Sequence, residues 1–132
     1  MIFGVGVDLA RVERFRVVWA RRGQRFARRI LHALEHEPFA VAGDPARDLA
    51  KRWAAKEAYA KALGTKIGRI AAHDIGLLRD PDSGAPRIVL SEHGAAFSER
   101  RGAGRVHISL SDEGDLVIAM VVLEPAAGAS GP

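Results

Sequence analysis

A lysine inside an apolar helical pattern is the feature that most constrains how this chain can fold. Residues 52–65 are rich in Ala, Leu, Lys and Glu, which are strong helix formers, and Gly64 is typical of a helix C-terminus. The helical period places Lys56 on the stripe that this helix should bury against the rest of the protein. Because an unpaired ammonium is costly to bury, we expect an anionic group to lie against Lys56.

Glu57 and Lys61 lie four residues apart, so the same helix places them on one face. They could form an ordinary surface ion pair, with the Lys56 ammonium reaching water along its flexible stem. They could also belong to a catalytic site, but a motif of this size often occurs by chance. The helix alone favours the surface ion pair, so other segments have to decide.

The N-terminal segment adds a second carboxylate. Residues 2–8 alternate as a β-strand, with Gly4, Gly6 and Asp8 on one face. The two glycines leave room on that face for another backbone or a ligand to come close. Taken alone, Asp8 is best explained as the N-cap of the helix that follows.

Two segments near the C-terminus predict a β-hairpin. Residues 105–111 alternate between an apolar face and a polar face, and the polar face consists of His107, Ser109 and Ser111. After a polar turn, residues 116–124 return as an almost wholly apolar strand, which should be buried on both sides. On its own, the polar face of the first strand is typical of a solvated surface.

The rest of the chain predicts an α+β fold in a single domain. Residues 35–48 contain two prolines and a glycine and indicate a loop. Predicted strands at residues 75–79 and 87–90 flank a turn, and Ser91 begins a helix that runs to about Arg101. We therefore expect helices packed on one face of an antiparallel sheet of about four or five strands.

Composition excludes several classes of protein. With 132 residues and 48% hydrophobic content, the chain is large enough for one domain with a core of its own. It has no cysteine, which excludes disulfide and thiolate chemistry and suits a reducing cytoplasm. No apolar run is long enough to cross a membrane, and the first residues predict a strand rather than a signal peptide. Residues 125–132 predict a disordered tail, which leaves residues 1–124 as the folded domain.

The positive charge is concentrated near the N-terminus. Residues 11–29 contain eight arginines and one acid, so this segment carries +7 while the rest of the chain carries −3. A helix that is basic on one side predicts an acidic partner. Nucleic acid is the generic alternative, but no aromatic interleaving or nucleic-acid motif supports it. An arginine bias on a solvated face would explain some of the eight.

Together these segments resemble the short bacterial holo-acyl-carrier-protein synthases, a group of 4′-phosphopantetheinyl transferases. The matching motifs follow the family order and are found at residues 4–15, 26–31, 52–68, 84–86 and 107–111. Two positions differ from the usual pattern of the family. Lys66 stands where members usually carry glycine, and Asp112 stands where many carry a second histidine.

The resemblance implies a reaction in the cytoplasm. The 4′-phosphopantetheine arm of coenzyme A would be transferred to a serine of an apo acyl carrier protein, with release of adenosine 3′,5′-bisphosphate. The alternative is a non-catalytic basic module that binds an acidic protein or nucleic acid. Such a module needs no carboxylates or histidine in these positions, so the occurrence of Asp8, Glu57, Lys61 and His107 in one chain favours the transferase.

The resemblance also implies a metal site. Asp8 and Glu57 are expected to hold one Mg²⁺ against the pyrophosphate of coenzyme A, since Mg²⁺ favours one or two carboxylates together with phosphate oxygens. Lys61 is expected near the pyrophosphate. The base that takes the proton of the carrier serine stays open among Glu57, a metal-bound water and neutral Lys61.

Further contacts follow from the same resemblance. Gly64, Thr65 and Gly68 would shape a loop around coenzyme A, with backbone N–H groups toward phosphate. The 3′-phosphate end would meet Arg52 and the polar face that carries His107 and Ser109.

The resemblance also implies how the carrier protein docks and how the subunits assemble. Arg14 and Arg21 are seven residues apart, on one helix face, and would meet acidic residues of the carrier protein. Two-lobed relatives build one site between two similar halves, and a chain of this length cannot supply both halves. The resemblance therefore implies a homotrimer with active sites at the subunit interfaces.

Overall fold

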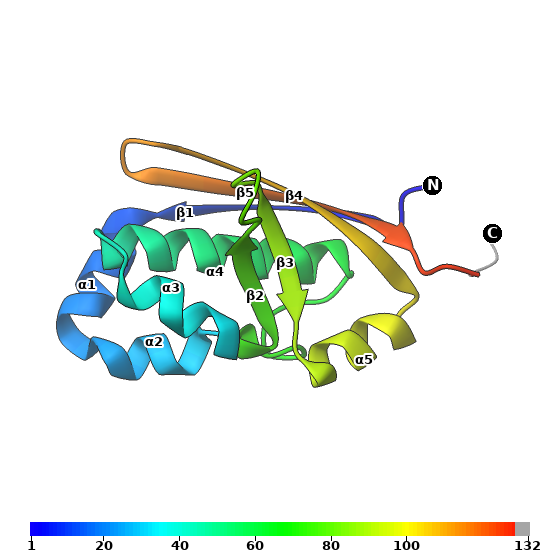
Figure 1. The fold of residues 1–132 in the computed structure, drawn as a ribbon, viewed down its shortest axis with the longest axis horizontal. Helices are drawn as coiled ribbons and strands as arrows, with labels where there is room; N and C mark the ends of the chain where they lie inside the picture. The colour runs from blue at the N-terminus through cyan, green and yellow to red at the C-terminus, as the bar shows by residue number, and fades with distance from the viewer. Residues whose placement is uncertain (129–132) are drawn as a thin grey trace.

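The structure is a computed structural model and describes residues 1–128. It confirms the α+β class, with helices packed against antiparallel sheets (Figure 1). The predicted tail of residues 125–132 lies partly outside the described residues. Within them, the last strand continues through Pro125, and the backbone N–H of Ala126 donates to the carbonyl of Gly102 at 2.8 Å.

Three long strands form the main sheet. They are β1 (Gly4–Arg11), β4 (Ala103–Glu113) and β5 (Leu116–Pro125), in the order β1-β5-β4 with antiparallel pairing throughout. One long helix, α4 (Pro45–Ala62), lies along one face of this sheet (Figure 1). β4 and β5 form the predicted hairpin, and Gly114 in its turn has a φ of 58°.

β1 approaches α4 more closely than side chains would allow. A Cβ atom placed on Gly4 or Gly6 would lie 1.9 Å from the carbonyl oxygen of Ala62 or Ala58, respectively. The room that the two glycines leave is therefore filled by the backbone of α4. This close packing brings the end of β1, with Asp8, against the C-terminal half of the helix.

Shorter helices cover the remaining sides of α4. They are α1 (Val12–Arg22), α2 (Gln24–Ile30), α3 (His36–Ala40) and α5 (Glu92–Arg100), together with the 3₁₀ turns η1 (Ala33–Glu35) and η2 (Ala72–Asp74). The predicted start of α5 is confirmed, because the hydroxyl of Ser91 accepts from the N–H of Gly94 at 3.0 Å. The expectation that Asp8 caps a helix is wrong, since α1 begins at Val12 and Asp8 lies within β1.

The predicted loop at residues 35–48 is wrong in two places. It contains α3, and α4 begins at Pro45 rather than beyond residue 48. Proline is tolerated in the first turn of a helix, where its missing N–H has no helical partner in any case. Asp44 caps α4, with its carboxylate accepting from the N–H of Arg47 at 3.4 Å. Here the proline marks a helix start, not a loop.

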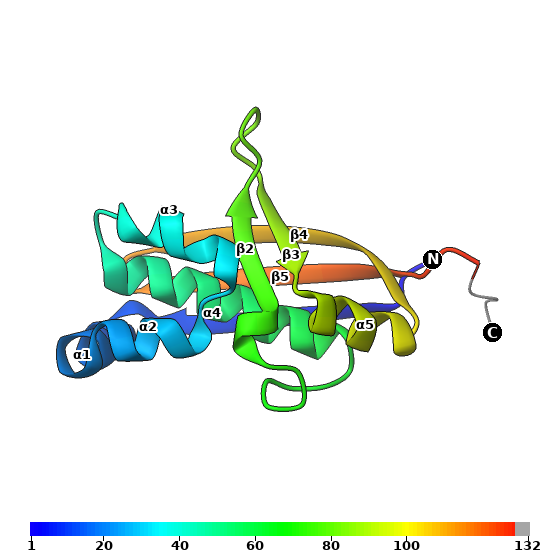
Figure 2. The same ribbon diagram turned by 60° about the horizontal axis from the view of Figure 1, so that its bottom comes forward.

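The prediction of one sheet with four or five strands is also wrong. β2 (Ile75–Arg79) and β3 (Pro86–Leu90) exist close to the predicted bounds, but they form a separate two-stranded sheet. This hairpin crosses the direction of the long strands, and its tip projects away from the body of the protein (Figures 1 and 2).

Lys56 is fully buried, as predicted, and its anionic partner comes from the same chain. Its Nζ donates to Glu35 Oε1 at 2.5 Å, to the carbonyl of Ala72 at 3.1 Å and to the carbonyl of Ile75. The alternative in which Lys56 reaches water is wrong. Glu35 is itself fully buried and lies in η1, so this ion pair ties η1 and β2 to α4.

The far side of the main sheet is exposed. Inward residues of β5 such as Val117 and Val121 are buried, but Ile118 and Met120 are 39% and 45% exposed. Burial of β5 on both sides is therefore wrong for a single chain. We call the apolar surface on this side the outer apolar face; it consists of Val5, Val7, Leu9, Ile118 and Met120. Among the described residues, no helix is long and apolar enough to span a membrane.

Candidate active site

Asp8 and Lys61 meet where β1 crosses the C-terminal half of α4. The Lys61 Nζ lies 3.2 Å from Oδ1 of Asp8 and donates to the carbonyl of Val7 at 2.9 Å. The Asp8 side chain is only 16% exposed, while that of Lys61 is 50% exposed. The close approach at Gly6 makes this contact possible, because a wider gap between β1 and α4 would separate the two side chains.

Glu57 lies one helical turn before Lys61 and adds a second carboxylate. Its pKa is raised above the ordinary value, first by partial burial and then by the charge of Asp8. The positive charges of Lys61 and Arg14 act in the opposite direction. The structure thus brings together four of the predicted residues, with two carboxylates that repel each other and two cations beside them.

This pair of carboxylates fits the predicted magnesium ion. A divalent cation would relieve the repulsion between Asp8 and Glu57. Across residues 1–128, no cluster of three or more His, Cys, Asp or Glu side chains is placed to hold a metal. The protein therefore offers two carboxylates, and Mg²⁺ commonly accepts this number when phosphate oxygens and water complete its shell.

The loop after α4 follows directly from the turn that carries Lys61. Gly64 and Gly68 have φ values of 78° and 115°, which favour glycine. The described non-glycine residues have no positive φ, so Lys66 fits the loop without strain. The hydroxyl of Thr65 is buried and has no hydrogen-bond partner within the described residues. Such an orphaned polar group suits a loop that receives a ligand.

Arg101 holds this loop, and sequence reasoning did not identify it. Its Nε donates to the carbonyl of Leu63 at 3.1 Å, and its Nη2 donates to the carbonyl of Gly64 at 3.2 Å. Both acceptors are backbone carbonyls at the C-terminus of α4. A basic residue just after a predicted helix is too common a signal to indicate such a contact.

The predicted carrier-docking arginines lie on the surface of α1. Arg14 and Arg21 are both exposed, and their seven-residue spacing places them on one face of the helix. Beside them a cavity of about 600 Å³ opens between α1, α2 and α4. Its apolar lining includes Phe26 and Trp53, and Arg22 also contributes to it. The surface thus combines an apolar hollow with positive charge.

His107 and Ser109 lie on the opposite face of the sheet from Asp8. The pairing register places His107, Val122 and Val5 in one row across the sheet, on its outer side. Asp8 belongs to the row of Ala119 and Leu110, whose side chains point toward α4. His107 and Asp8 of one chain therefore point to opposite faces of the main sheet.

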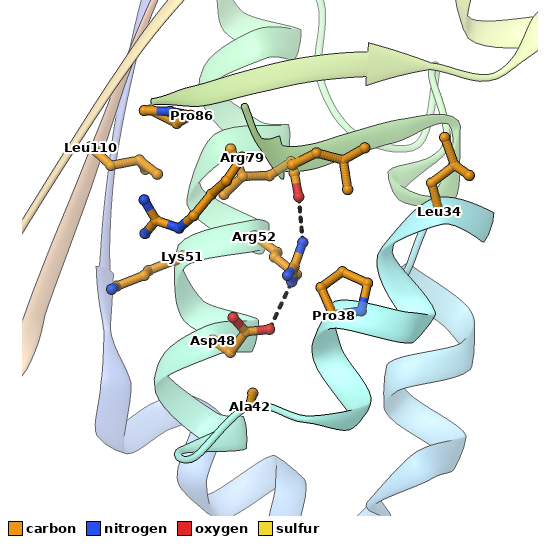
Figure 3. A pocket seen from close by; sticks show the side chains of 11 residues that line it. Leu34, Pro38, Ala42, Asp48, Lys51, Arg52, Arg79, Pro86 and Leu110 are labelled. Carbon is orange, nitrogen blue, oxygen red and sulfur yellow. Dashed lines mark hydrogen bonds and ion pairs between the residues drawn. The ribbon is translucent and has the colours of Figure 1, made fainter. Parts of the chain in front are cut away.

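Arg52 is 7% exposed, and much of its guanidinium is committed within the protein. Its Nε lies 2.7 Å from Asp48 Oδ2, and its Nη1 donates to Glu35 Oε2 at 3.0 Å and to the carbonyl of Leu77. Arg52 also lines a cavity of about 400 Å³ between α4 and the β2–β3 hairpin (Figure 3). Its contact with the 3′-phosphate end of coenzyme A stays a prediction.

Two accessible cations lie at the sheet-facing side of this cavity. Lys51 and Arg79 both point toward the side where Leu110 lies (Figure 3). A smaller hollow of about 190 Å³ shares Lys51, Arg79 and Leu110 and extends to Ser109. Arg52 and Ser109 therefore lie around adjoining hollows at the β4 edge. The predicted residues form two separate groups: one at β1 and the other at β4.

Known proteins share the sequence pattern and the fold of this chain. Residues 4–121 match the model of the 4′-phosphopantetheinyl transferase superfamily. A holo-[acyl-carrier-protein] synthase of Thiobacillus denitrificans is 46% identical over 128 residues, covering 96% of this chain and 97% of the relative.

Two solved structures have the same fold. A crystal structure of a holo-[acyl-carrier-protein] synthase from Neisseria meningitidis has a TM-score of 0.88 and 42% identity, covering 94% of this chain and 99% of the other. One from Bacillus anthracis, in complex with coenzyme A, has a TM-score of 0.77 and 31% identity, covering 96% and 99%. This chain therefore belongs to the 4′-phosphopantetheinyl transferase superfamily, and within it to the holo-acyl-carrier-protein synthases.

Proposed function

We propose that this enzyme transfers the 4′-phosphopantetheine arm of coenzyme A to a serine of an apo acyl carrier protein in the cytoplasm, with Mg²⁺. Adenosine 3′,5′-bisphosphate is the second product. The observation that carries the proposal is the convergence of Asp8 and Glu57 beside Lys61 and Arg14. A family whose relatives carry this activity supports the same reading.

Asp8 and Glu57 are the residues that would hold the metal. When bound, Mg²⁺ supplies neutralising charge to the pyrophosphate during cleavage of the phosphoanhydride. The Lys61 ammonium donates to Asp8 and to the carbonyl of Val7. As a charged donor it stabilises negative charge on the phosphate rather than acting as a base.

The proton of the carrier serine needs an acceptor. Of the two protein candidates, Glu57 is favoured, because its carboxylate is an acceptor while Nζ of Lys61 already donates to Asp8 and to the carbonyl of Val7. The serine oxygen forms its new bond to the β-phosphorus while the bond from that phosphorus to the bridging oxygen breaks. The proton passes to Glu57, and the electron pair of the broken bond leaves with the nucleotide.

The separation of the two groups of predicted residues supports a site that is built from two chains. Arg52 and Ser109 are at the β4 edge, and His107 points to the outer side of the sheet, away from Asp8. We propose a homotrimer in which the β4 edge of one subunit holds the nucleotide end of coenzyme A. The neighbour's Asp8 and Glu57 hold its pyrophosphate. The outer apolar face supports this assembly, because exposed apolar surfaces of this kind mark protein interfaces.

A mass measurement tests the proposed activity. The protein is incubated with an apo acyl carrier protein, coenzyme A and Mg²⁺, and the carrier is analysed by intact mass spectrometry. We expect a gain of one phosphopantetheine group, which is lost with a chelator and in the Asp8→Asn variant. A carrier that binds the protein but never gains mass would contradict the proposal and favour a non-catalytic binding module.

A further inference from the structure

Glu124 lies against His107 at the outer side of the main sheet. Its Oε2 atom is 2.6 Å from Nε2 of His107. The pairing of β4 and β5 places the two side chains on the same face, since His107 pairs with Val122 and Glu124 follows two residues later. Both side chains are partly exposed, at 49% for His107 and 42% for Glu124, so a ligand can still reach them.

The position of the shared proton follows from the charge of Glu124. Its pKa is lowered, first by the hydrogen bond to His107, and Arg105 and the N-terminal amine act in the same direction. An ionised carboxylate can only accept, so the proton lies on Nε2 of His107. Nδ1 is then the ring nitrogen left for another partner, and it can donate only when the ring carries both protons.

We propose that Glu124 is a positioning residue for coenzyme A, which orients His107 so that Nδ1 is available to the 3′-phosphate. This inference rests on the proposed function, because coenzyme A is the ligand. A carboxylate that accepts from the far nitrogen of a histidine commonly sets its orientation and tautomer. Arg105 adds positive charge beside the pair, so an anionic phosphate would find a basic surface despite the carboxylate.

Binding measurements on the intact protein test the role of Glu124. Dissociation constants for coenzyme A and for dephospho-coenzyme A, which lacks the 3′-phosphate, are measured by calorimetry at several pH values. At pH of about 8, Glu124→Gln should weaken coenzyme A binding about tenfold and leave dephospho-coenzyme A within about twofold. Glu113→Gln, which removes a charge from the other end of β4, should match wild type throughout.

The possible results distinguish a failure of the proposed role of Glu124 from a failure of the proposed transferase function. Equal weakening of both ligands at all pH values would show a structural role and overturn the proposal. No change, or tighter binding of coenzyme A, would overturn it as well. A wild-type protein that binds coenzyme A but does not discriminate against dephospho-coenzyme A would remove the phosphate contact while leaving the transferase intact. A wild-type protein that fails to bind coenzyme A would remove both.

Discussion

Among single residues, Glu57 works against the stability of the fold. The pKa of Glu57 is raised by burial and by Asp8, so the folded chain holds the Glu57 proton more tightly than the unfolded chain. The contribution of Glu57 to stability therefore falls as the pH rises from its ordinary pKa of 4.5 through its raised pKa in the folded protein. A catalytic carboxylate kept at such a cost is typical of a functional site.

Removing that charge should stabilise the protein without metal. We expect Glu57→Gln to melt at a higher temperature than wild type at pH of about 8, and to lose activity. The difference in Tm should vanish at pH of about 4 or below, where Glu57 is protonated in both states. Scanning calorimetry with a chelator measures it, with Glu99→Gln on α5 as the control. A lower Tm for Glu57→Gln at pH of about 8 would contradict this account.

Two single residues of α1, Arg14 and Arg21, are expected to bind the carrier protein. Replacing Arg14 and Arg21 together by Glu should weaken carrier binding by at least about tenfold at low salt, because the partner is expected to be acidic. Coenzyme A binding should be unchanged, and the affinity of wild type for the carrier should fall with added salt. The double variant Arg87→Glu/Arg100→Glu, on β3 and α5, controls for net charge. A carrier affinity that does not change with salt concentration would show that Arg14 and Arg21 are ordinary surface residues.

Among the elements, the Glu35–Lys56 pair joins η1 and β2 to α4. Glu35 also accepts from the N–H groups of His32 and Leu77, at 2.8 and 2.9 Å. Burial alone would raise its pKa, but Lys56 and these hydrogen bonds outweigh burial, so the pKa is lowered. Glu35 therefore stabilises the fold at pH values above its ordinary pKa of 4.5. This contribution is lost as the pH falls through the lowered pKa of the folded protein.

Breaking this pair from one side should cost far more than removing both charges. Glu35→Gln leaves the buried Lys56 uncompensated and should lower the free energy of unfolding by about 3–5 kcal/mol at pH of about 7. The double variant Glu35→Gln/Lys56→Met should recover much of that loss, because the buried ammonium is gone and Arg52, the other cation at Glu35, keeps its pair with Asp48. Urea denaturation of the three proteins measures both values. A double variant that is as unstable as Glu35→Gln, or less stable, would show that the two residues do not act as a pair.

Local patterns predicted the elements, and contacts distant in sequence decided their arrangement. The helix through Lys56, the hairpin and the cap at Ser91 follow from periodicity and capping, which depend on near neighbours. The partner of Lys56 is Glu35, which is 21 residues away in sequence. It lies at the start of a segment that was predicted to be a loop because it contains two prolines. The division into two sheets follows from how β2 and β3 pack, which no local pattern encodes. The same holds for Arg101 and Glu124, whose contacts arise only after folding.

In the whole molecule, the residues that we propose for one reaction lie on opposite sides of the main sheet. Asp8, Glu57 and Lys61 gather where β1 meets α4, while His107 points to the outer side of the sheet. The apolar character of β5 was predicted from the sequence, but its outer side chains Ile118 and Met120 stay exposed in a single chain. The central claim is therefore that a working site takes one part from each of two neighbouring subunits.

Mixing two defective proteins tests this claim most directly. Asp8→Ala and His107→Ala chains are each assayed at a coenzyme A concentration where neither alone modifies the carrier, then unfolded together, refolded and assayed again. We predict that activity returns, because mixed assemblies contain interfaces with Asp8 from one chain and His107 from the other. Two Asp8→Ala preparations treated in the same way should stay inactive. Mixed chains that co-assemble but remain inactive, or a fully active monomer by light scattering, would contradict the shared site.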